Sequence, residues 1–249
     1  MIIYDSNNWV RVQLEKDFSG LGMRLCWSEA TKQDGELKIF VFDGVNGNAL
    51  RRALYPDYKK TRQLPADTFF ENLAFFKELL RNAPSNVAVA ERYGYEGDDV
   101  IWTLCKMFSA SPKPITIMST DKDLTAIPNT VVPMANQDFC QKKYVHLYKT
   151  LVGDPSDNIK GVKGFGKGSW DKLTDMEKDD LIRWFSSGLS DDLTLSVSPK
   201  LWDIIRRQDS AETLRNWTIT GFFDVPNLEL KFGDGHTEIA EQKLKELLI

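Results

Sequence analysis

Acidic residues stand in this sequence at positions where a metal-dependent reaction could use them. The nine that matter are Asp5, Asp43, Glu96, Asp98, Asp99, Asp121, Asp123, Asp154 and Asp157. Carboxylate oxygens are the ligands that Mg²⁺ prefers, and phosphodiester hydrolysis commonly uses two such ions about 3.5–4 Å apart. The pattern therefore indicates metal-assisted hydrolysis of a phosphate ester, provided that the fold brings the acids together.

Short apolar runs separated by helical patterns predict an α/β domain around a mostly parallel sheet. The predicted strands cover residues 1–4, 37–42, 86–90, 115–118 and 130–133. Between them, residues 67–82 and 100–108 carry apolar side chains at helical spacing. We expect these helices to pack against the faces of the sheet.

Three of the predicted strands run directly into an aspartate, namely Asp5, Asp43 and Asp121. Because ligands of open α/β sheets bind at the carboxyl ends of the strands, we expect these three side chains to share one edge. An isolated aspartate after a strand is more often a turn or helix-capping residue. Their joint placement favours a site over three separate caps.

The other acids flank neighbouring elements. Three stand where the helix of residues 100–108 begins, one follows Asp121 by two residues, and two open a glycine-rich segment: Glu96, Asp98, Asp99, Asp123, Asp154 and Asp157. Acids in a first helical turn can simply complement the helix dipole. So many like charges at one sheet edge would nevertheless repel each other without a cation.

The charge of the chain neither requires nor excludes a nucleic-acid partner. The formal net charge is −4, whereas nucleic-acid-binding domains are usually basic. Setting aside the nine acids leaves 27 acidic against 32 basic residues. The remaining surface is therefore compatible with binding phosphates, although this balance is no evidence for it.

The numbers and spacing of cysteine and histidine residues indicate the cellular compartment. The three cysteines (Cys26, Cys105, Cys140) and two histidines (His146, His236) form neither a disulfide framework nor a zinc-type spacing. The sequence begins without the pattern of a signal peptide and contains no long apolar run. These features predict a cytoplasmic protein without a membrane partner.

The character of the sequence changes near residue 149. Glycines cluster at Gly161, Gly164, Gly166 and Gly168, and helical patterns follow at residues 170–185 and 201–207. We therefore predict a core domain at residues 1–148 and a smaller helical region at 149–249. Its tail, residues 221–249, contains a possible strand at 228–232 and a short final helix.

At these residues the sequence resembles the flap endonuclease/5′-exonuclease family, which includes the 5′-nuclease domain of bacterial DNA polymerase I and stand-alone phage 5′ nucleases. Four motifs in the family's order carry the resemblance: FDGVNGNALRRALYPDYKKTR at 42–62, YEGDDV at 95–100, STDKDL at 119–124 and GDPSDNIKGVKGFGKG at 153–168. Departures are limited. Gly97 replaces the usual alanine, Gly168 a frequent lysine, and Trp170 a small residue.

The resemblance implies roles for particular residues. Asp43, Glu96, Asp98 and Asp121 match metal-site positions, Asp5 matches one that often acts through water, and Asp99, Asp123, Asp154 and Asp157 match acids that complete a second metal site. Tyr58, Lys59 and Arg62 match a catalytic element that meets the scissile phosphate. Cationic groups there can stabilise the charge that develops in the transition state.

The resemblance also implies two DNA-binding segments. Residues 161–168 resemble a helix–three-turn–helix that binds duplex backbone and can hold K⁺ through its carbonyls, and residues 48–82 correspond to an arch over the active site. The expected DNA contacts are Arg51, Arg52, Lys60, Lys160, Gly161, Lys163, Gly164, Gly166 and Lys167. In the arch, Tyr55, Tyr58, Phe69 and Phe70 could stack on bases, whereas Leu73, Phe76 and Leu80 are expected in the core.

Together these features predict a PIN-like 5′-nuclease core with a helical duplex-binding region. We expect a monomeric hydrolase with two Mg²⁺ ions, which Mn²⁺ can replace, acting on DNA with a free 5′ end, flap, nick or gap, or on an RNA/DNA hybrid. The products would carry a 5′-phosphate and a 3′-hydroxyl, and a phage-encoded enzyme would serve replication, primer removal or DNA degradation in the host cytoplasm. The alternatives are a PIN-type ribonuclease and a catalytically silent DNA-binding homologue.

Overall fold

The computed structural model describes residues 1–15, 21–136, 141–190, 192 and 194–246. Two units are present, and each is assembled from segments that are distant in the sequence. We call the first the sheet unit; it comprises Met1–Gly47, Leu64–Phe139 and Phe223–Ile249. The second, the helical unit, comprises Asn48–Gln63 and Cys140–Phe222.

A six-stranded sheet in the order β5-β4-β1-β2-β3-β8 forms the centre of the sheet unit. Its strands are β1 (Ile2–Asp5), β2 (Lys38–Val41), β3 (Val87–Ala90), β4 (Ile115–Met118), β5 (Thr130–Val131) and β8 (Lys231–Phe232). All neighbours are parallel except β3 and β8. The predicted mostly parallel α/β fold is therefore confirmed.

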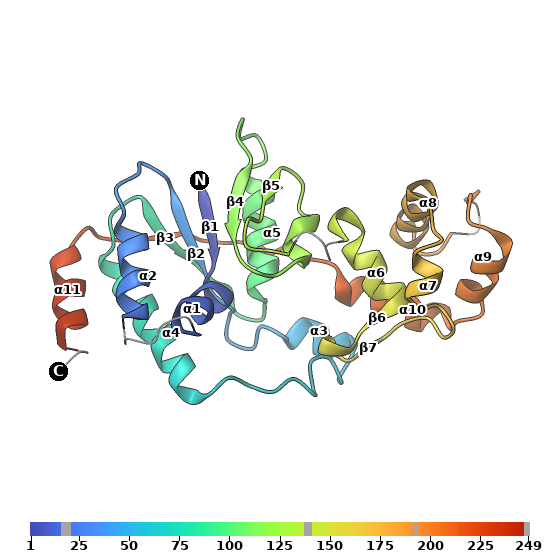
Figure 1. Ribbon diagram of the computed structural model, residues 1–249, viewed down its shortest axis with the longest axis horizontal. Helices are drawn as coiled ribbons and strands as arrows, with labels where there is room; N and C mark the ends of the chain where they lie inside the picture. The colour runs from blue at the N-terminus through green and yellow to red at the C-terminus, as the bar shows by residue number, and fades with distance from the viewer. Residues whose placement is uncertain (16–20, 137–140, 191, 193, 247–249) are drawn as a thin grey trace. The chain divides into compact units, whose positions relative to one another are not determined.

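Helices cover both faces of this sheet (Figure 1). On one face lie α1 (Ser6–Glu15), α2 (Gly22–Thr31) and α4 (Asp67–Leu79), which continues into the 3-10 turn Leu80–Asn82; α5 (Gly97–Met107) packs against β1 and β2. The last helix, α11 (Thr237–Glu246), adds Ala240 and Leu244 to the first face. All four residues of β2 and of β3 are buried, as expected for central strands covered on both sides.

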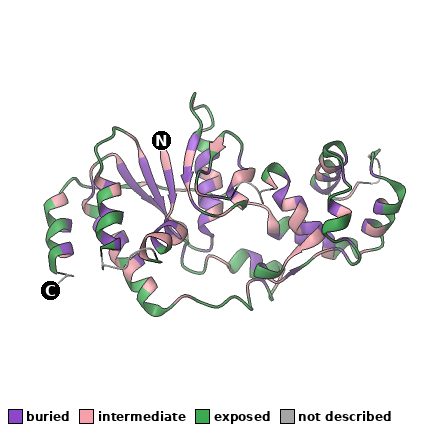
Figure 2. Cartoon of the chain, in the orientation of Figure 1, coloured by how far each residue is buried: buried purple, intermediate pink, exposed green. Residues whose placement is uncertain are grey.

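Aromatic side chains fill the core between the sheet and α1, α2 and α4. Tyr4 stacks on Phe40 with ring centroids 4.3 Å apart, and Phe76 meets Phe40 edge to face at 5.4 Å. Leu73 and Leu80 are buried in the same cluster, which confirms the core positions expected within residues 67–82. Figure 2 shows the buried residues concentrated in the strands and on the inner sides of the helices.

A fully buried lysine on β2 binds the carbonyl groups at the end of α2. The Nζ of Lys38 donates to the carbonyls of Glu29 (2.9 Å) and Lys32 (2.7 Å) and pairs with Asp34 at 3.2 Å. Carbonyls at the end of a helix have no partner within the helix. Lys38 therefore ties the end of α2 to β2.

The helical unit contains α3 (Ala49–Leu54), a 3-10 turn (Lys142–Tyr144), α6 (Val145–Val152), α7 (Lys167–Trp170), α8 (Asp175–Ser186), α9 (Pro199–Arg206) and α10 (Ser210–Thr220). The short strands β6 (Gly153–Asp154) and β7 (Ile159–Lys160) pair around the turn Pro155–Asp157. Thr174 and Glu177 form a capping box that starts α8. Trp170, Leu181 and Phe185 lie in the unit's core.

The units differ from the predicted division at residues 148 and 149 in two places. Residues 48–63 belong to the helical unit, where α3 packs against α10, and residues 223–249 return to the sheet unit. In that return, β8 pairs antiparallel with β3. Backbone pairing and helix packing between distant segments leave no local pattern in the sequence. A division at one boundary therefore could not predict that each unit is built from separate segments.

Some elements have no counterpart in the sequence analysis. Helices α1, α2, α3, α6 and α10 were not predicted, and the strand expected at residues 228–232 is limited to Lys231–Phe232. Cys140 and residues 247–249 of the predicted tail lie outside the described residues. Within the part that is described, no helix is both long and apolar enough to cross a membrane.

Candidate active site

The carboxyl ends of the parallel strands bring the first group of acids to one edge of the sheet. Asp5 ends β1, Asp43 follows β2 by two residues, and Asp121 follows β4 by three. The backbone N–H of Gly97, at the start of α5, donates to Asp43 Oδ1 at 2.6 Å. Ser119 Oγ, just after β4, donates to Asp5 Oδ2 at 2.8 Å. Hydrogen bonds thus connect neighbouring strand ends through these carboxylates.

Asp5 shows how crowded this edge is. Burial raises its pKa, and the nearby carboxylates of Asp43 and Asp121 add to the rise, which reaches about 7. The Ser119 hydroxyl and the N–H of Asn8 oppose the rise by stabilising the ionised form. Like charges held together in a half-buried place are the environment that a divalent cation relieves. The all-oxygen donor set fits Mg²⁺ by its chemistry.

Two asparagines that the sequence analysis did not single out organise the edge. Asn7 Nδ2 donates to Asp43 Oδ2 at 2.8 Å, and Asn8 Nδ2 donates to Thr120 Oγ1 at 2.8 Å. The N–H of Thr120 donates in return to Asn8 Oδ1 at 2.9 Å. In the sequence, only their position two and three residues after Asp5 could have identified them.

Asp121 and Asp123 lie together after β4. The N–H of Asp121 donates to Ser119 Oγ at 3.0 Å, and the N–H of Asp123 donates to Asp121 Oδ1 at 2.8 Å. Asp123 begins the 3-10 turn Asp123–Ala126, and both carboxylates are half-buried. The turn therefore holds the two aspartates of the STDKDL motif beside each other.

The acids at the start of α5 are placed in different environments. Glu96 and Asp99 form a reciprocal capping box, in which the N–H of Glu96 donates to Asp99 Oδ2 at 3.3 Å. Asp99 is fully buried, and its Oδ1 accepts the N–H of Phe223 at 2.8 Å. Asp99 therefore caps the helix and anchors the returning tail, while Asp98 is half-buried. The metal roles assigned to these acids stay predictions.

Gly97 departs from the family pattern at a place where space is short. A Cβ built on Gly97 would lie 3.2 Å from Asp43 Oδ1, the atom that accepts the Gly97 N–H. The glycine leaves this hydrogen bond unhindered. The departure thus affects how closely α5 approaches Asp43 and removes no acid.

In this conformation the carboxylates of the edge are hydrogen-bonded rather than grouped as ready ligands. Among the described residues, no three aspartate, glutamate, cysteine or histidine side chains are arranged to hold one metal ion. The set of ligands therefore stays a prediction, supported by the donor chemistry and by the crowding around Asp5.

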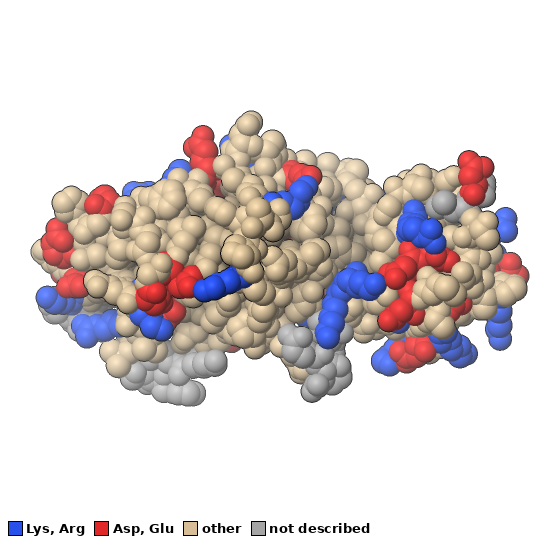
Figure 3. All heavy atoms as spheres, turned by 90° about the horizontal axis from the view of Figure 1, so that it is seen from above, with Lys and Arg blue, Asp and Glu red and all other residues tan. Residues whose placement is uncertain are grey.

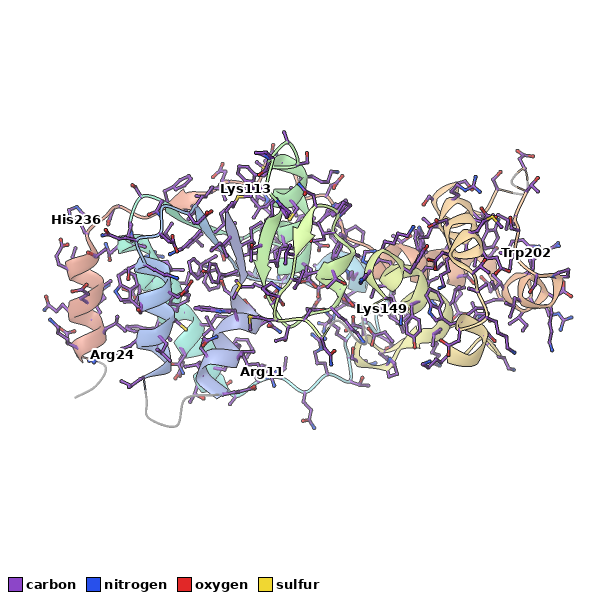
Figure 4. The ribbon with its side chains drawn as sticks, turned by 45° about the horizontal axis from the view of Figure 1, so that its top comes forward. Arg11, Arg24, Lys113, Lys149, Trp202 and His236 are labelled. Carbon is purple, nitrogen blue, oxygen red and sulfur yellow. The ribbon has the colours of Figure 1, made fainter. Side chains whose placement is uncertain are left out.

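The helical unit holds the other two acids, and there the chain supplies cations. The Nζ of Lys149, on α6 (Figure 4), lies 2.7 Å from Asp154 Oδ2 and 4.0 Å from Asp157 Oδ2. Arg62 Nη2 lies 3.2 Å from Asp157 Oδ1. Lys149 was missed in the sequence because nothing local marks a lysine four residues before the GDPSDN motif as an internal counter-ion.

The two acids respond differently to these cations. Burial opposes ionisation of Asp154, but Lys149 and the donors of Ser156 outweigh it and hold the pKa below the usual range. Burial also raises the pKa of Asp157, and there it outweighs the attraction of Lys59, Lys149 and Arg62. The more buried acid of the pair is thus the one that binds its proton more strongly.

The segment with the predicted catalytic residues packs on the turn that carries Asp157. The N–H of Lys59 donates to the Asp157 carbonyl at 3.0 Å, and Asn158 Nδ2 donates to the Asp57 carbonyl at 3.0 Å. The Nζ of Lys59 lies 5.0 Å from the centroid of the buried Tyr58 ring. Lys59 has φ of +54°, a left-handed conformation that few non-glycine residues adopt. The structure thus brings Tyr58, Lys59 and Asp157 together.

Arg51 is placed differently from its expected DNA contact. Only 4% of the residue is exposed, and its guanidinium donates to the carbonyls of Ile219 (3.0 Å) and Gly221 (2.8 Å) at the end of α10. This geometry makes Arg51 a buried anchor between α3 and α10. Arg52 and Lys60 are exposed, as a DNA contact requires.

The glycine-rich segment presents lysines on a constrained backbone. Lys160, Lys163 and Lys167 are exposed. A Cβ on Gly161 would lie 2.3 Å from the carbonyl carbon of Val152, and Gly164 has φ of +84°, so both positions require glycine. Lysines around a tight backbone turn are suited to bind phosphates.

Further basic residues, at the end of α9 and directly after it, lie near this segment and were not identified from the sequence. The N–H of Lys163 donates to Gln208 Oε1 at 3.3 Å, just beyond the exposed Arg206 and Arg207. Elsewhere on the surface the charges are mixed: on the face in Figure 3, acidic side chains lie among basic ones. Any phosphate-binding surface on this face is therefore local.

A family model described as "5′-3′ exonuclease, N-terminal resolvase-like domain" matches residues 22–151, which is more than half of the chain. The 5′-3′ exonuclease of Aquifex aeolicus (strain VF5) is 32% identical over 158 residues, which cover 58% of this chain and 54% of that protein. DNA polymerase I of Thermus aquaticus is also 32% identical over 158 residues, 58% of this chain and 19% of the polymerase. The chain thus spans about half the length of the first relative.

Solved structures share the fold. The T5 5′-exonuclease with bound divalent metal ions (zinc) aligns with a TM-score of 0.61 at 18% identity, over 100% of this chain and 98% of that one. The bacteriophage T5 flap endonuclease, in a pseudo-enzyme-product complex with DNA and metal ions, aligns with a TM-score of 0.58 at 19% identity, over 88% of both chains.

Proposed function

The chain belongs to the 5′-3′ exonuclease family with an N-terminal resolvase-like domain, and we propose that it is a divalent-metal-dependent 5′ nuclease acting on DNA. Its reaction is the hydrolysis of phosphodiester bonds at or near a free 5′ end, which leaves a 5′-phosphate and a 3′-hydroxyl. Relatives named 5′-3′ exonuclease and DNA polymerase I support this proposal. Mg²⁺ is the proposed metal, and Mn²⁺ can substitute for it.

The observation that carries the proposal is the crowding of carboxylates at the strand ends. Asp5 lies close enough to Asp43 and Asp121 for both to raise its pKa. The hydrogen bond from Gly97 to Asp43 adds the start of α5, and with it Glu96 and Asp98, to the same edge. Asp43, Glu96, Asp98 and Asp121 would hold the ions, and Asp5 would act through water.

The bound ions would supply an activated water and neutralise the leaving oxygen. The chain's own part is to position the phosphate and the ions. Asn7 and Ser119 orient the carboxylates of Asp43 and Asp5 by hydrogen bonds. Lys59 and Arg62 would place positive charge at the reacting phosphate, where preorganised donors are most effective.

Asp154 and Asp157 are proposed to be among the acids that complete the second metal site, as the resemblance implies. Within the helical unit, Lys149 and Arg62 already balance part of their charge. Metal binding at this pair would therefore compete with internal cations, which does not hold for Asp5 at the sheet edge. The roles of the two groups need separate tests.

Incubation of the purified chain with 5′-flap, nicked and single-stranded DNA, with Mg²⁺ and with EDTA, tests the activity directly. We expect Mg²⁺-dependent release of products from the 5′ end and none in EDTA. Cleavage of RNA in preference to all three DNAs would favour the PIN-type ribonuclease. Tight binding of DNA without cleavage in Mg²⁺ or Mn²⁺ would favour the catalytically silent homologue.

We propose further that residues 48–82 select the free 5′ end. The chain leaves the acidic edge after Asp43 and returns to it at Glu96, and Arg52, Lys60 and Arg62 make the first half of the connection basic and exposed. Such a connection attracts single strands, and a strand that must thread under it needs a free end. Covalently closed single-stranded circles should therefore resist cleavage, as should DNA with a bulky protein bound at its 5′ terminus. Equal rates on circles and on open 5′ ends would contradict threading.

A further inference from the structure

An exposed aromatic side chain stands beside the acidic edge without a role in the site described above. Tyr93 is 68% exposed and Val45 is 69% exposed. Val45 follows Asp43 by two residues, and Tyr93 precedes Glu96 by three. Both residues therefore belong to turns that leave the carboxyl ends of β2 and β3 within the sheet unit.

Hydrogen bonds lock these two turns to each other. The N–H of Gly94 donates to the Val45 carbonyl at 2.9 Å, and the N–H of Gly44 donates to the Tyr95 carbonyl at 3.1 Å. The backbones approach so closely that a Cβ on Gly44 would lie 1.7 Å from the carbonyl oxygen of Arg92. Only glycine permits this contact, so the two turns form one rigid platform.

The ring of Tyr93 is itself held in place. Asn46 Nδ2 donates to the phenolic oxygen of Tyr93 at 2.9 Å. Asn46 has φ of +56°, a left-handed conformation that asparagine tolerates better than most residues. A ring that is already ordered loses little conformational freedom when it stacks on a ligand. The exposed ring is thus prepared to bind a flat partner.

We propose that Tyr93, on a turn that is hydrogen-bonded to the Val45 turn, is a stacking platform for one nucleobase next to the scissile phosphate. This inference rests on the proposed nuclease function and adds to it a residue that positions the substrate. A phosphate held at the acidic edge carries its sugar and base within about one nucleotide of the turns that follow Asp43 and precede Glu96. Every base offers a π-face, so such a contact binds without regard to sequence.

A nucleobase fits the surroundings better than an apolar protein segment. The platform is small, consisting of one ring and one β-branched side chain, and it adjoins carboxylates on both sides in the sequence. Protein interfaces require a much larger contact area. A single stacked base requires only one ring. The phosphate of the same nucleotide, held at the acidic edge, would place the base near Tyr93.

The test compares abasic DNA with intact DNA. A set of 5′-flap DNAs carries one abasic nucleotide at each position flanking the cleavage site, and binding is measured with Ca²⁺ in place of Mg²⁺, so that a cation occupies the acidic edge while cleavage is suppressed. For Tyr93→Ala we expect an increase of roughly 10-fold in Kd on intact DNA. At one position the abasic nucleotide should weaken wild-type binding by a similar factor, yet leave Tyr93→Ala unaffected, as a double-mutant cycle requires for a direct contact.

Two variants serve as controls. Tyr93→Phe keeps the ring and loses only the acceptor for Asn46, so it should restore most of the binding. Met107→Ala removes a side chain that is 57% exposed at the far end of α5, and it should leave both the Kd and the abasic effect unchanged. Thermal melting of each variant checks that the fold is kept.

Equal abasic effects in wild type and Tyr93→Ala at every position would overturn the stacking platform. The cleavage assay in Mg²⁺ separates this outcome from failure of the nuclease function. If the wild type binds the flap DNA without cutting it, the proposed activity is wrong, and the abasic comparison still decides the role of Tyr93. If the wild type does not bind these DNAs at all, both proposals are overturned.

Discussion

The acids of the sheet edge and the acids of the helical unit show two ways of holding carboxylates close together. At the sheet edge, Asp5 accepts hydrogen bonds from the neutral Ser119 hydroxyl and Asn8 N–H, and the groups that shift its pKa by charge are other carboxylates. In the helical unit, Lys149 and Arg62 pair directly with Asp154 and Asp157. Asp5 is thus surrounded by neutral donors and further acids, whereas Asp154 and Asp157 pair with cations of the chain.

Aspartates therefore have different consequences for stability and for ligand binding in the two regions. A carboxylate crowded by other carboxylates reduces stability, so such crowding indicates a cationic ligand. Carboxylates paired with internal lysine or arginine stabilise the local fold and can do so without any ligand. We therefore expect substitutions at the sheet edge to affect cleavage more than stability, and substitutions in the helical unit to affect stability as well.

The largest effect is expected for Asp121→Asn. Loss of one carboxylate from the crowded edge should reduce cleavage by about 10³-fold or more, which corresponds to several kcal/mol of transition-state stabilisation. DNA binding should persist, because removing a negative charge weakens repulsion of the phosphates. Single-turnover cleavage and DNA binding in EDTA measure the two effects, with Asp224→Asn as an exposed control in the same unit. Near-normal turnover of Asp121→Asn would remove the edge from the active site.

A smaller kinetic effect is expected for Lys59→Ala. Loss of one preorganised cation should lower turnover by roughly 10²–10³. The combined replacement of Lys163 and Lys167 by alanine should instead weaken duplex binding and reduce the log–log salt slope by about 0.9 for each lost phosphate contact. Salt titrations of binding, together with single-turnover rates, separate chemistry from affinity. If both changes alter affinity alone, Lys59 does not act at the reacting phosphate.

Lys149→Met tests whether the helical unit depends on its internal cation. The change leaves Asp154 and Asp157 in partly buried positions without their shared counter-charge. We expect the free energy of unfolding to fall by about 3 kcal/mol at neutral pH and to recover partly in the double variant with Asp154→Asn. Denaturant unfolding measures both. An unchanged midpoint for Lys149→Met would show that solvent replaces the ion pair at no cost.

The smallest effect concerns His146, a half-buried histidine of α6 whose ring Nε2 is enclosed. Burial, and then the charges of Lys149 and Arg51, lower its pKa to about 4. Between this value and its ordinary pKa of 6.5 the unfolded chain binds the extra proton and the folded chain does not. His146 therefore contributes full stability above pH 6.5, and that contribution is lost as the pH falls toward 4.

The expected loss attributable to His146 is about 2 kcal/mol between pH 7 and pH 5. Denaturant unfolding of the wild type and of His146→Gln at both pH values measures this loss. The variant lacks the titrating group, so its stability should change less over the same interval. Identical pH dependence in the two proteins would mean that acids, rather than this histidine, control the stability of the unit.

Much of the sheet unit could be predicted because its signals are local. Apolar runs of strand length ended at Asp5, Asp43 and Asp121, and parallel strands place their carboxyl ends at one edge. The predicted strand at residues 115–118 matches β4 in both bounds, and β5 is shorter than predicted. Helix α4 begins at Asp67 as expected from its apolar spacing.

Contacts between distant segments could not be predicted in the same way. The sequence predicted that Arg51 contacts DNA. In the structure Arg51 is buried, and its guanidinium donates to the carbonyls of Ile219 and Gly221 at the end of α10. Lys149 has no local mark of a counter-ion. These placements depend on which segment fills the space beside a side chain, and residue spacing does not carry that information.

Local patterns in the sequence were enough to predict a chemical class for this protein. The types of the acids, their spacing after the strands and the order of four motifs indicated a metal-dependent nuclease, because metal ligands and phosphate-binding turns need particular residues at particular positions. The pairing of the charged groups, in contrast, followed from the tertiary fold. Arg62 and Asp157, for example, pair although they are 95 residues apart in the sequence, and the energy of a charge depends on such neighbours rather than on its own side chain.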